Sequence, residues 1–302
     1  MTGVQTCALP ISTKGIPDGA TVQSSGLSFS GDGSVLTFSI RGKPKPDLPK
    51  ILPEEKVVVD IWHWNDGYIQ SMQAKRRGSS GETRTCALHL ADGRVTVLGD
   101  ESIPSMRLLT HNGDRALATD NKPYEKLVTW DGRYSDVYVV NTRNGSRRKL
   151  ITKLRGRTST SPSGRYVLYF GQDYQWYSLD VVTKKQRCLT SGLNVSFQNV
   201  LDDRPQPSSA YGIVGWTKGD EHVLINDRYD IWKITMLGGE TTCVTDGFGR
   251  ENRIVLRYSR FDLEGDDDTL SPDEKLYLPD TILLTAKKDR KSTRLNSSHT
   301  SI

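Results

Sequence analysis

The stretch Thr158–Thr190 reads TSTSPSGRYVLYFGQDYQWYSLDVVTKKQRCLT and contains one complete repeat of this chain. It begins with two apolar runs joined by a tight polar turn around Gly164. An aromatic run ending in Asp180, a second polar turn and a short run ending in Thr190 follow. Short β-branched and aromatic runs bounded by Gly, Asp, Asn and Ser are typical of strands. The stretch therefore predicts two successive hairpins, which make four antiparallel strands.

The same pair of hairpins recurs along the chain. The first hairpin is centred on a glycine that follows a polar residue, a position that favours a positive φ; these glycines are Gly33, Gly113, Gly164 and Gly219. The second hairpin recurs at Ser135–Thr152, Tyr174–Thr190 and Tyr229–Thr245, and more weakly at Cys86–Asp100. Val57–Trp64 (VVVDIWHW) is predicted to be the first half of another copy. The longer step from Gly33 to Gly113 indicates an insertion.

Four-stranded repeats of about 40 to 50 residues are typical of a β-propeller, in which each repeat is one blade. A β-sandwich also has many short strands but lacks this four-strand recurrence. The sequence therefore predicts an all-β fold, an incomplete β-propeller of about four four-stranded antiparallel blades between Thr13 and Gly247. A fifth blade is expected to begin near Arg253.

The codons of the two chain ends can be reverse complements of each other. With allowed codons, the reverse complement of residues 1–11 encodes residues 289–299, and this string resembles a sequencing adapter. A chance inverted repeat is the alternative. We therefore expect residues 1–12 and 289–302 to be adapter-derived and to pack against nothing specific, and such segments are excluded from fold reasoning. Residues 13–288 are then a partial β-propeller domain.

Composition gives few indications of a partner. The formal net charge of the 302 residues is +5, and it falls to +3 without Arg290, Lys291, Arg294 and Asp289. Nucleic-acid binders concentrate basic charge on one face, whereas the basic stretches 73–84 and 144–157 are expected to be solvated turns, so no nucleic-acid partner is predicted. No apolar run is long enough to span a bilayer.

The cysteines and histidines show no metal-binding spacing. Cys86, Cys188 and Cys243 are widely separated, and the last two occupy equivalent positions in two repeats. We expect all three to be small core residues. The histidines are scattered among strands and turns, at His63, His89, His111 and His222, and His63 is expected to be structural or to face solvent. No metal or other cofactor is predicted.

Three stretches carry a family resemblance: VVVDIWHWNDGYIQSMQAKRR, SPSGRYVLYF with YQWYSLDVVTKKQRCLT, and DIWKITMLGGETTCVT. With them the chain resembles the propeller domain of prolyl oligopeptidase family serine peptidases, including the dipeptidyl peptidase type, and the wider TolB-like propellers. The resemblance implies a non-catalytic portion that gates or positions peptide substrates for a missing C-terminal α/β-hydrolase domain. It favours a periplasmic or secreted protein, although the sequence itself gives no location.

This chain contains no Gly-x-Ser-x-Gly motif, the turn that exposes the nucleophile in such hydrolases. The nearest string, GLSFSG at Gly26–Gly31, has the wrong spacing. No catalytic residue is therefore predicted in this chain, and the peptide substrate would be hydrolysed only by the parent protein. A stand-alone TolB-like propeller that acts as a protein-binding scaffold is the alternative.

Glu54 and Glu55 are the candidate substrate-binding residues. In some dipeptide-releasing members of the resembled family, a glutamate pair in the propeller holds the free amino terminus of the substrate by charge pairing. Here the pair follows the Pro-rich stretch KPKPDLPKILP, so two solvated surface carboxylates are the competing interpretation.

Other acidic and aromatic residues have simpler interpretations. The stretch Asp262–Glu274 fails the spacing of a calcium-binding EF-hand loop and is expected to be an acidic surface loop. A propeller glycosidase with inward carboxylates at Asp60, Asp136 or Asp230 is a third hypothesis, but recurrence in each repeat suits a structural role better. The tryptophans at equivalent repeat positions are expected to pack between blades; they are Trp62, Trp176 and Trp232.

Overall fold

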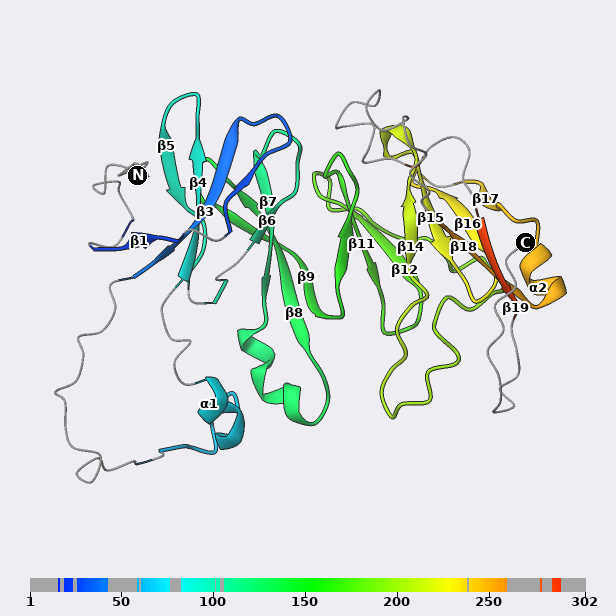
Figure 1. The fold of residues 1–302 in the computed structure, drawn as a ribbon, viewed down its shortest axis with the longest axis horizontal. Helices are drawn as coiled ribbons and strands as arrows, with labels where there is room; N and C mark the ends of the chain where they lie inside the picture. The colour runs from blue at the N-terminus through cyan, green and yellow to red at the C-terminus, as the bar shows by residue number, and fades with distance from the viewer. Residues whose placement is uncertain are drawn as a thin grey trace, which may run out of the picture. The chain divides into compact units, whose positions relative to one another are not determined.

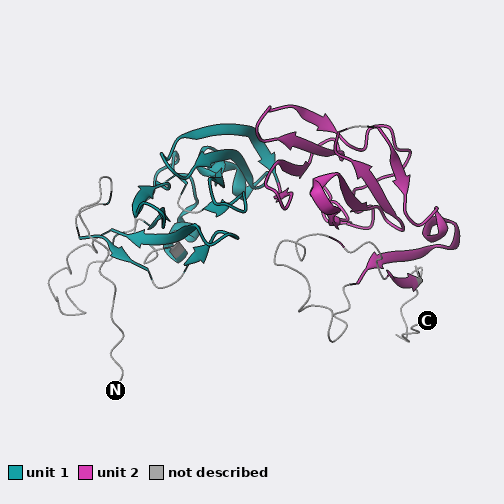
Figure 2. Cartoon of the chain, turned by 90° about the horizontal axis from the view of Figure 1, so that it is seen from above, with its two compact units in different colours: residues 1–155 teal, residues 156–302 magenta. Residues whose placement is uncertain are grey.

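The computed structural model describes residues 16, 19–23, 26–42, 59, 61–76, 83–100, 102–103, 106–237, 239–259, 278 and 284–288. The chain divides into two compact units, Met1–Arg155 and Gly156–Ile302 (Figure 2). The predicted adapter-derived ends, 1–12 and 289–302, lie outside the described residues.

Unit 1 contains two antiparallel sheets (Figure 1). Sheet 1 consists of β1 (Thr21–Val22), β2 (Ser28–Phe29), β3 (Val35–Arg41), β4 (Thr83–His89) and β5 (Arg94–Val97). Sheet 2 consists of β6 (Met106–Leu108), β7 (Arg115–Asp120), β8 (Tyr134–Asn141) and β9 (Arg147–Arg155). Two short helices interrupt this pattern: α1 (Gln70–Arg76) precedes β4, and the 3₁₀ helix η2 (Lys122–Thr129) precedes β8.

Unit 2 repeats the arrangement. Sheet 3 consists of β10 (Thr158–Thr160), β11 (Tyr166–Phe170), β12 (Trp176–Asp180) and β13 (Gln186–Cys188). Sheet 4 consists of β14 (Ile213–Trp216), β15 (His222–Asn226), β16 (Ile231–Thr235) and β17 (Thr241–Cys243), with the 3₁₀ helix η3 (Lys218–Asp220) between β14 and β15. After α2 (Phe248–Asn252), a two-stranded ribbon pairs β18 (Ile254–Tyr258) with β19 (Leu284–Lys288).

The predicted fold class is confirmed. The chain is mostly β, with few helices, and sheets 2, 3 and 4 each pair four antiparallel strands in chain order. Sheet 1 departs from this only because β1 and β2 both pair with β3. Strand β18 begins at Ile254, next to Arg253, where a fifth blade is predicted; among the described residues it pairs only with β19.

The turn of each first hairpin is closed by the same hydrogen bond. The hydroxyl of a Ser or Thr before the turn accepts from the backbone N–H five residues later; the four residues, here called the hydroxyl brackets, are Ser30, Thr110, Ser161 and Thr217. The turn glycines have positive φ as predicted, including 72° at Gly164. A Ser or Thr side chain that bonds nearby backbone groups favours a turn over continued strand, so each bracket fixes where its hairpin reverses.

The cores lie between neighbouring sheets within each unit. In unit 1, Val35 and Ala87 of sheet 1 pack with Ala116 and Val140 of sheet 2. In unit 2, a larger cluster joins Tyr166, Leu168 and Trp176 of sheet 3 to apolar residues of sheet 4; these are Trp216, Val223, Ile225 and Ile234. Side chains alternate between the two faces of a strand, and stacking covers one face of each sheet with the next.

Sheet 1 is apolar on its second face as well. Phe38, Ile40 and Cys86 are buried there, with Ile16 and Ala20 packed against them. Two apolar faces explain why β3 has two adjacent buried positions instead of a strict alternation. This double burial is expected of a sheet that belongs inside a stack of blades.

Three expectations about local structure are wrong. The described residues of Val57–Trp64, which are Val59 and 61–64, form no strand; the segment belongs to the insertion between β3 and β4. Trp62 is exposed and lies in none of the described cores, because the described residues around it belong to no strand. The basic run 144–157 is largely strand β9 instead of a turn.

The cysteine interpretation is confirmed only for Cys86. Its side chain is buried, and burial raises the pKa of its thiol to about 12. Cys188 and Cys243 lie at equivalent places, opposite Tyr177 and Trp232, but on the outermost strands, where both are partly exposed. All three described cysteines are free thiols.

Strand β9 forms an edge of sheet 2 and is protected against pairing with another chain. Its register with β8 shifts twice, and Lys153 within it has a φ of 51°. Bulges and basic side chains are common ways of blunting a sheet edge, so the basic composition of β9 has a structural explanation. Among the described residues, no helix is both long and apolar enough to cross a bilayer.

Candidate functional site

Two long connections meet at one end of the sheets of unit 1. In an antiparallel sheet with strands in chain order, the connection after the second strand leaves from the end opposite the first turn. The connection from β3 to β4 carries α1, and the connection from β7 to β8 carries η2; Figure 1 shows α1 at this end of the strands. The equivalent connections in unit 2 are short, at 171–175 and 227–230.

The two insertions contact each other. The Lys126 ammonium of η2 donates to the Asn65 side-chain carbonyl and lies 5.7 Å from the centre of a Trp64 ring. A β-carbon added to Gly67 would overlap the Glu125 side chain, so the backbone of the first insertion lies directly against η2. The insertions therefore form one layer.

Asp66 organises the first insertion from within. Its carboxylate accepts from the His63 backbone N–H at 2.8 Å and from the Gln73 side chain at 2.9 Å. The His63 N–H bond is the largest influence, and with the Gln73 bond it holds the pKa of Asp66 below its ordinary value. The segment before α1 is thus folded onto the helix, and His63 is solvent-facing as expected.

The two insertions expose large apolar side chains. Trp62, Trp64 and Trp130 are 62%, 81% and 75% exposed, respectively. Ile61 and Ile69 are exposed beside them in sequence. We call these five residues the tryptophan layer. Proteins rarely leave several large apolar side chains exposed close together in the sequence, and such exposure is typical of sites that contact a protein or peptide.

Sequence reasoning did not find the tryptophan layer. The repeat pattern predicts Trp62 in a core, and it indicates no role for Trp64 or Trp130. The sequence feature that points to this surface is the long interval between the turn glycines Gly33 and Gly113. It indicates an inserted loop, and long loops on a regular scaffold often carry function.

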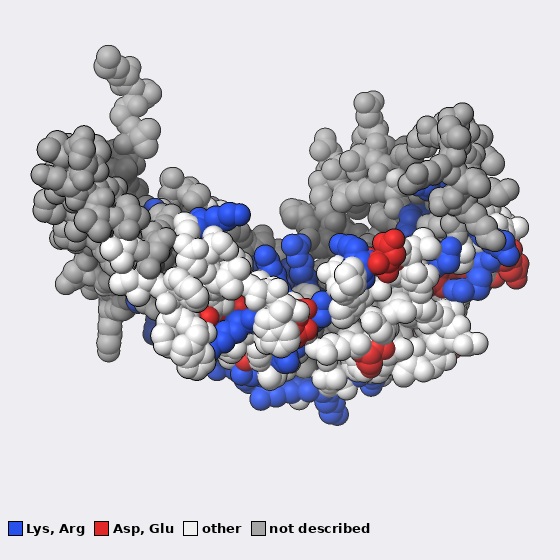
Figure 3. Space-filling view, turned by 90° about the horizontal axis from the view of Figure 1, so that it is seen from below, with Lys and Arg blue, Asp and Glu red and all other residues white. Residues whose placement is uncertain are grey.

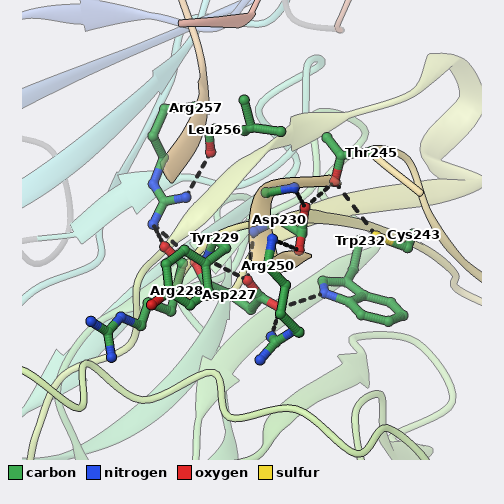
Figure 4. A network of polar contacts seen from close by, with 11 residues as sticks. Asp227, Arg228, Tyr229, Asp230, Trp232, Cys243, Thr245, Arg250, Leu256 and Arg257 are labelled. Atoms are coloured by element: carbon green, nitrogen blue, oxygen red, sulfur yellow. Dashed lines mark hydrogen bonds and ion pairs between the residues drawn. The ribbon is translucent and has the colours of Figure 1, made fainter. Parts of the chain in front are cut away.

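A second group of polar residues surrounds the turn between β15 and β16 in unit 2 (Figure 4). Asp230 is buried, and its carboxylate accepts from the Thr245 hydroxyl at 2.7 Å and from the backbone N–H groups of Gly249 and Arg250. Asp227 is also buried and accepts four hydrogen bonds; the donors are Tyr229 N, Asp230 N, the Trp232 indole and the Arg250 guanidinium.

These bonds give both carboxylates a structural role. A carboxylate has about four lone-pair sites, and Asp227 uses four. Asp230 joins β16 to α2, and Asp227 closes the turn. The sequence signal was Asp-x-x-Asp before an aromatic strand, since Asp side chains close turns by bonding nearby backbone N–H groups.

Asp136 of sheet 2 is satisfied in a comparable way. It accepts from the Tyr124 hydroxyl at 2.7 Å, the Lys149 ammonium at 2.5 Å and the Lys153 backbone N–H at 2.9 Å. Burial alone raises the pKa of this carboxyl, but the three hydrogen bonds outweigh burial and hold the pKa below its ordinary value. Asp136 therefore locks η2 and β9 onto β8.

The remaining candidates divide into described and undescribed residues. Glu54, Glu55, Asp60 and the stretch Asp262–Glu274 lie outside the described residues. Trp176 is buried in the core of unit 2 and Trp232 packs against that core, as expected. Within the described part of the chain, no three His, Cys, Asp or Glu side chains are grouped as metal ligands. Figure 3 shows Lys and Arg side chains in several separate groups, with Asp and Glu side chains and uncharged surface among them.

Comparison with known proteins gives distant likenesses of fold. No family model matches the chain, and no curated protein matches it. Oligogalacturonate lyase in complex with manganese is 15% identical with a TM-score of 0.42, over 88% of this chain and 62% of that one. Dipeptidyl peptidase 4 of Porphyromonas gingivalis is 13% identical with a TM-score of 0.42, over 77% of this chain and 34% of that one.

A third similar structure is the β-propeller domain of the Trilobed protease from Pyrococcus furiosus. It is 8% identical with a TM-score of 0.39, over 90% of this chain and 69% of that one. The chain thus spans less than two thirds of the length of the first two structures. At these identities the likeness concerns the fold alone.

Proposed function

We propose that this chain is the non-catalytic β-propeller portion of a prolyl oligopeptidase-like serine peptidase. Its role is to gate or position peptide substrates for a C-terminal α/β-hydrolase domain. The observation that carries the proposal is the tryptophan layer, which exposes Trp62, Trp64 and Trp130 on two insertions at one end of unit 1. Tryptophan is enriched among the residues that dominate binding to proteins and peptides.

The described carboxylates support a binding role over a catalytic one. A glycosidase needs two carboxyl groups free to exchange protons or attack a sugar. The carboxylate oxygens of Asp136 and Asp230 instead accept hydrogen bonds that hold neighbouring elements together. The glycosidase hypothesis therefore has no support among the described residues.

A stand-alone TolB-like propeller that binds a protein partner is the second candidate. The tryptophan layer favours it equally, because the same surface suits a peptide or a folded partner. The two candidates differ in what the reading frame encodes after residue 288.

The deciding experiment is to amplify this locus from source DNA and sequence outward past codons 12 and 288. A following hydrolase domain with Gly-x-Ser-x-Gly supports the peptidase. A frame that adds blades and then stops supports the scaffold and contradicts the peptidase. The same reads test whether residues 1–12 and 289–302 are adapter-derived, since those codons then vanish.

The contact role is tested in the protein that the locus encodes. If it is a peptidase, Trp62→Ala with Trp64→Ala should lower kcat/KM for an extended peptide and leave hydrolysis of a small ester unchanged. Leu237→Ala is the matched control, because Leu237 is another exposed apolar side chain on a turn. Equal kcat/KM values in the double variant and the wild type would contradict the proposal.

A further inference from the structure

We propose that the edge of β14 in unit 2, at Gly215 and Trp216, binds an extended peptide that adds to sheet 4 as a further strand. The site holds a branched aliphatic side chain against Gly215, and Leu278 of this chain occupies it in the structure. The inference goes beyond the proposed function, because it assigns a peptide ligand to unit 2 and does not involve the tryptophan layer.

One edge of β14 has no strand beside it among the described residues. Sheet 4 runs in the order β14, β15, β16 and β17, so β14 has β15 on one side only. The Thr217 N–H donates to the His222 carbonyl at 3.0 Å, toward β15. Because backbone groups alternate between the two sides of a strand, the Trp216 carbonyl points away from β15. Unpaired backbone groups at a sheet edge are a template for another strand.

Leu278 already uses this edge. Its backbone N–H donates to the Trp216 carbonyl at 2.7 Å, within the usual range for an N–H···O bond. Leu278 lies in the connection between β18 and β19, far along the chain from β14. The edge therefore accepts a backbone donor from outside sheet 4, which is the first requirement of strand addition.

Gly215 provides the room for the side chain of the added residue. A β-carbon at Gly215 would stand 2.7 Å from Leu278 Cγ and 2.9 Å and 3.0 Å from the two Cδ atoms. Carbon atoms in contact normally lie about 3.5–4.0 Å apart, so no side chain fits at position 215 beside Leu278. Gly215 does not have a positive φ, so the backbone alone would accept a larger residue. A glycine inside a strand often marks such a close approach.

The rest of β14 holds this edge in place. The Trp216 side chain is 4% exposed and stacks on the Tyr166 ring of sheet 3. Successive side chains point to opposite faces of a strand, so Gly215 faces away from this core. The register with β15 shifts between Ile213 and Gly215, and such bulges are common beside binding sites. The site is thus formed before a peptide arrives, which lowers the entropic cost of binding.

The contacts of Leu278 define the chemistry of the ligand. In strand addition, main-chain hydrogen bonds provide affinity and pockets for alternate side chains provide specificity. Here the hydrogen bond needs a free backbone N–H, and the space beside Gly215 fits leucine. Leu278 is only half-buried, so the site borders solvent. An extended peptide with leucine at this position can therefore replace Leu278 contact for contact.

The test measures binding of a fluorescently labelled peptide to the full chain by fluorescence anisotropy. The peptide is N-acetyl-KLYLPD-amide, which is the sequence of residues 275–280. One control peptide has serine in place of its second leucine. Another carries a methyl group on the backbone nitrogen of that leucine, which removes the N–H donor.

The first variant is Leu278→Ser, which removes the competing side chain. It should bind the peptide about tenfold or more tightly than the wild type does, since burial of a leucine side chain is worth a factor of that size. Leu201→Ser is the matched control, because Leu201 is an exposed leucine elsewhere in unit 2, and this variant should bind like the wild type. Equal affinities of the wild type and Leu278→Ser would overturn the proposal, as would equal binding of either control peptide.

A second substitution, Gly215→Ala, locates the site. In the Leu278→Ser background it places a β-carbon where the leucine of the peptide should lie, and it should weaken binding about tenfold or more. Gly192→Ala is the matched control, because Gly192 has open space around it and no positive φ. Undiminished binding by a folded chain with both Gly215→Ala and Leu278→Ser would contradict the assignment.

A second copy of the chain is the competing occupant of this edge. A Leu278→Ser variant that dimerises in light scattering and ignores the peptide would overturn the proposal in favour of pairing between copies. If Leu278→Ser fails to fold, Leu278→Ala takes its place. If neither folds, the wild-type chain decides: it should bind excess peptide saturably but not the N-methyl peptide, and any other result overturns the proposal.

Discussion

At the scale of single residues, buried carboxylates hold this protein together at the ends of its strands. Asp136, Asp227 and Asp230 each accept three or four hydrogen bonds, which come from their own turn, from neighbouring strands or from α2. A buried charge is tolerated only when such bonds replace its water. These residues therefore fix the connections that the apolar cores do not reach.

Asp136 makes the stability of unit 1 depend on pH. Its pKa in the folded chain is lowered, because the bonds from Lys149, Lys153 and Tyr124 outweigh the effect of burial. It therefore contributes stability above its unfolded pKa of about 4, and that contribution is lost as pH falls through the folded pKa. Asp136→Asn should lower the free energy of unfolding at pH 7, and the difference from wild type should shrink below about pH 4.

The measurement is urea unfolding followed by tryptophan fluorescence between pH 7 and pH 3. Asp203→Asn is the control, since Asp203 is exposed and has no hydrogen bond among the described contacts. A difference between Asp136→Asn and wild type that stays constant across this range would show that the carboxylate does not act as described.

At the scale of elements, turns of one sheet pack into the next. Gly113, in the turn between β6 and β7, lies against Ser30 and Val35 of sheet 1, and the Thr142 hydroxyl donates to its carbonyl at 2.6 Å. A β-carbon at this glycine would stand 2.8 Å from the Val35 β-carbon. The turn is thus both a reversal of the chain and a contact between sheets.

Comparing Gly113→Ala with Gly93→Ala separates the effect of the positive φ at the turn from the effect of the contact between sheets. Both glycines have a positive φ, 65° and 66°, so alanine strains the backbone in each. Only Gly113 also meets neighbouring atoms; Gly93 has open space around it. Gly113→Ala should therefore be about 1–3 kcal/mol more destabilising than Gly93→Ala, the usual cost of overpacking. Equal thermal unfolding midpoints for the two variants would contradict this packing.

The hairpins were predictable from sequence, whereas the insertions were not. Strand, turn and strand around Gly164 are decided by neighbouring residues, so local pattern suffices there. Val57–Trp64 has the same β-rich composition, but a strand also needs a partner, and its described residues have none. Helix α1 has no acidic residue in its first turn, so it carried no start signal.

The contacts of the candidate sites could not be predicted from local sequence pattern either. The recurrence of Asp230 is visible in the sequence, but its partners Thr245 and Arg250 lie in later parts of the chain. Contacts of this kind depend on how the chain folds back, which no periodicity encodes. The hydrogen bond from the Arg257 guanidinium to the Asp227 backbone carbonyl could not be predicted from the sequence for that reason, since the two residues are 30 positions apart.

At the scale of the whole molecule, the tryptophans fall into two classes. Trp62, Trp64 and Trp130 are exposed, Trp176 and Trp216 are buried, and Trp232 is partly buried. Exposed and buried indoles differ in emission wavelength and in access to quenchers. Tryptophan fluorescence therefore reports separately on the exposed tryptophan layer and on the core.

Replacing Trp62, Trp64 and Trp130 together with Phe should remove most of the acrylamide-accessible fluorescence and leave a blue-shifted spectrum. Stability should change by no more than about 0.5 kcal/mol per site, because exposed side chains contribute little. The comparison is Trp176→Phe, which alters a core and should remove protected emission instead. A triple variant that keeps its quenchable emission would contradict the exposure of the tryptophan layer.

The hydroxyl brackets have a consequence for how the chain reaches its fold. Each bracket joins residues only five positions apart, as in Ser161 and Tyr166. Closing such a short loop takes little chain entropy and is fast. Four separate hairpins therefore start without waiting for distant strands, and the slow steps are left to the pairing of sheets. We therefore expect folding of this chain to start locally at four hairpins.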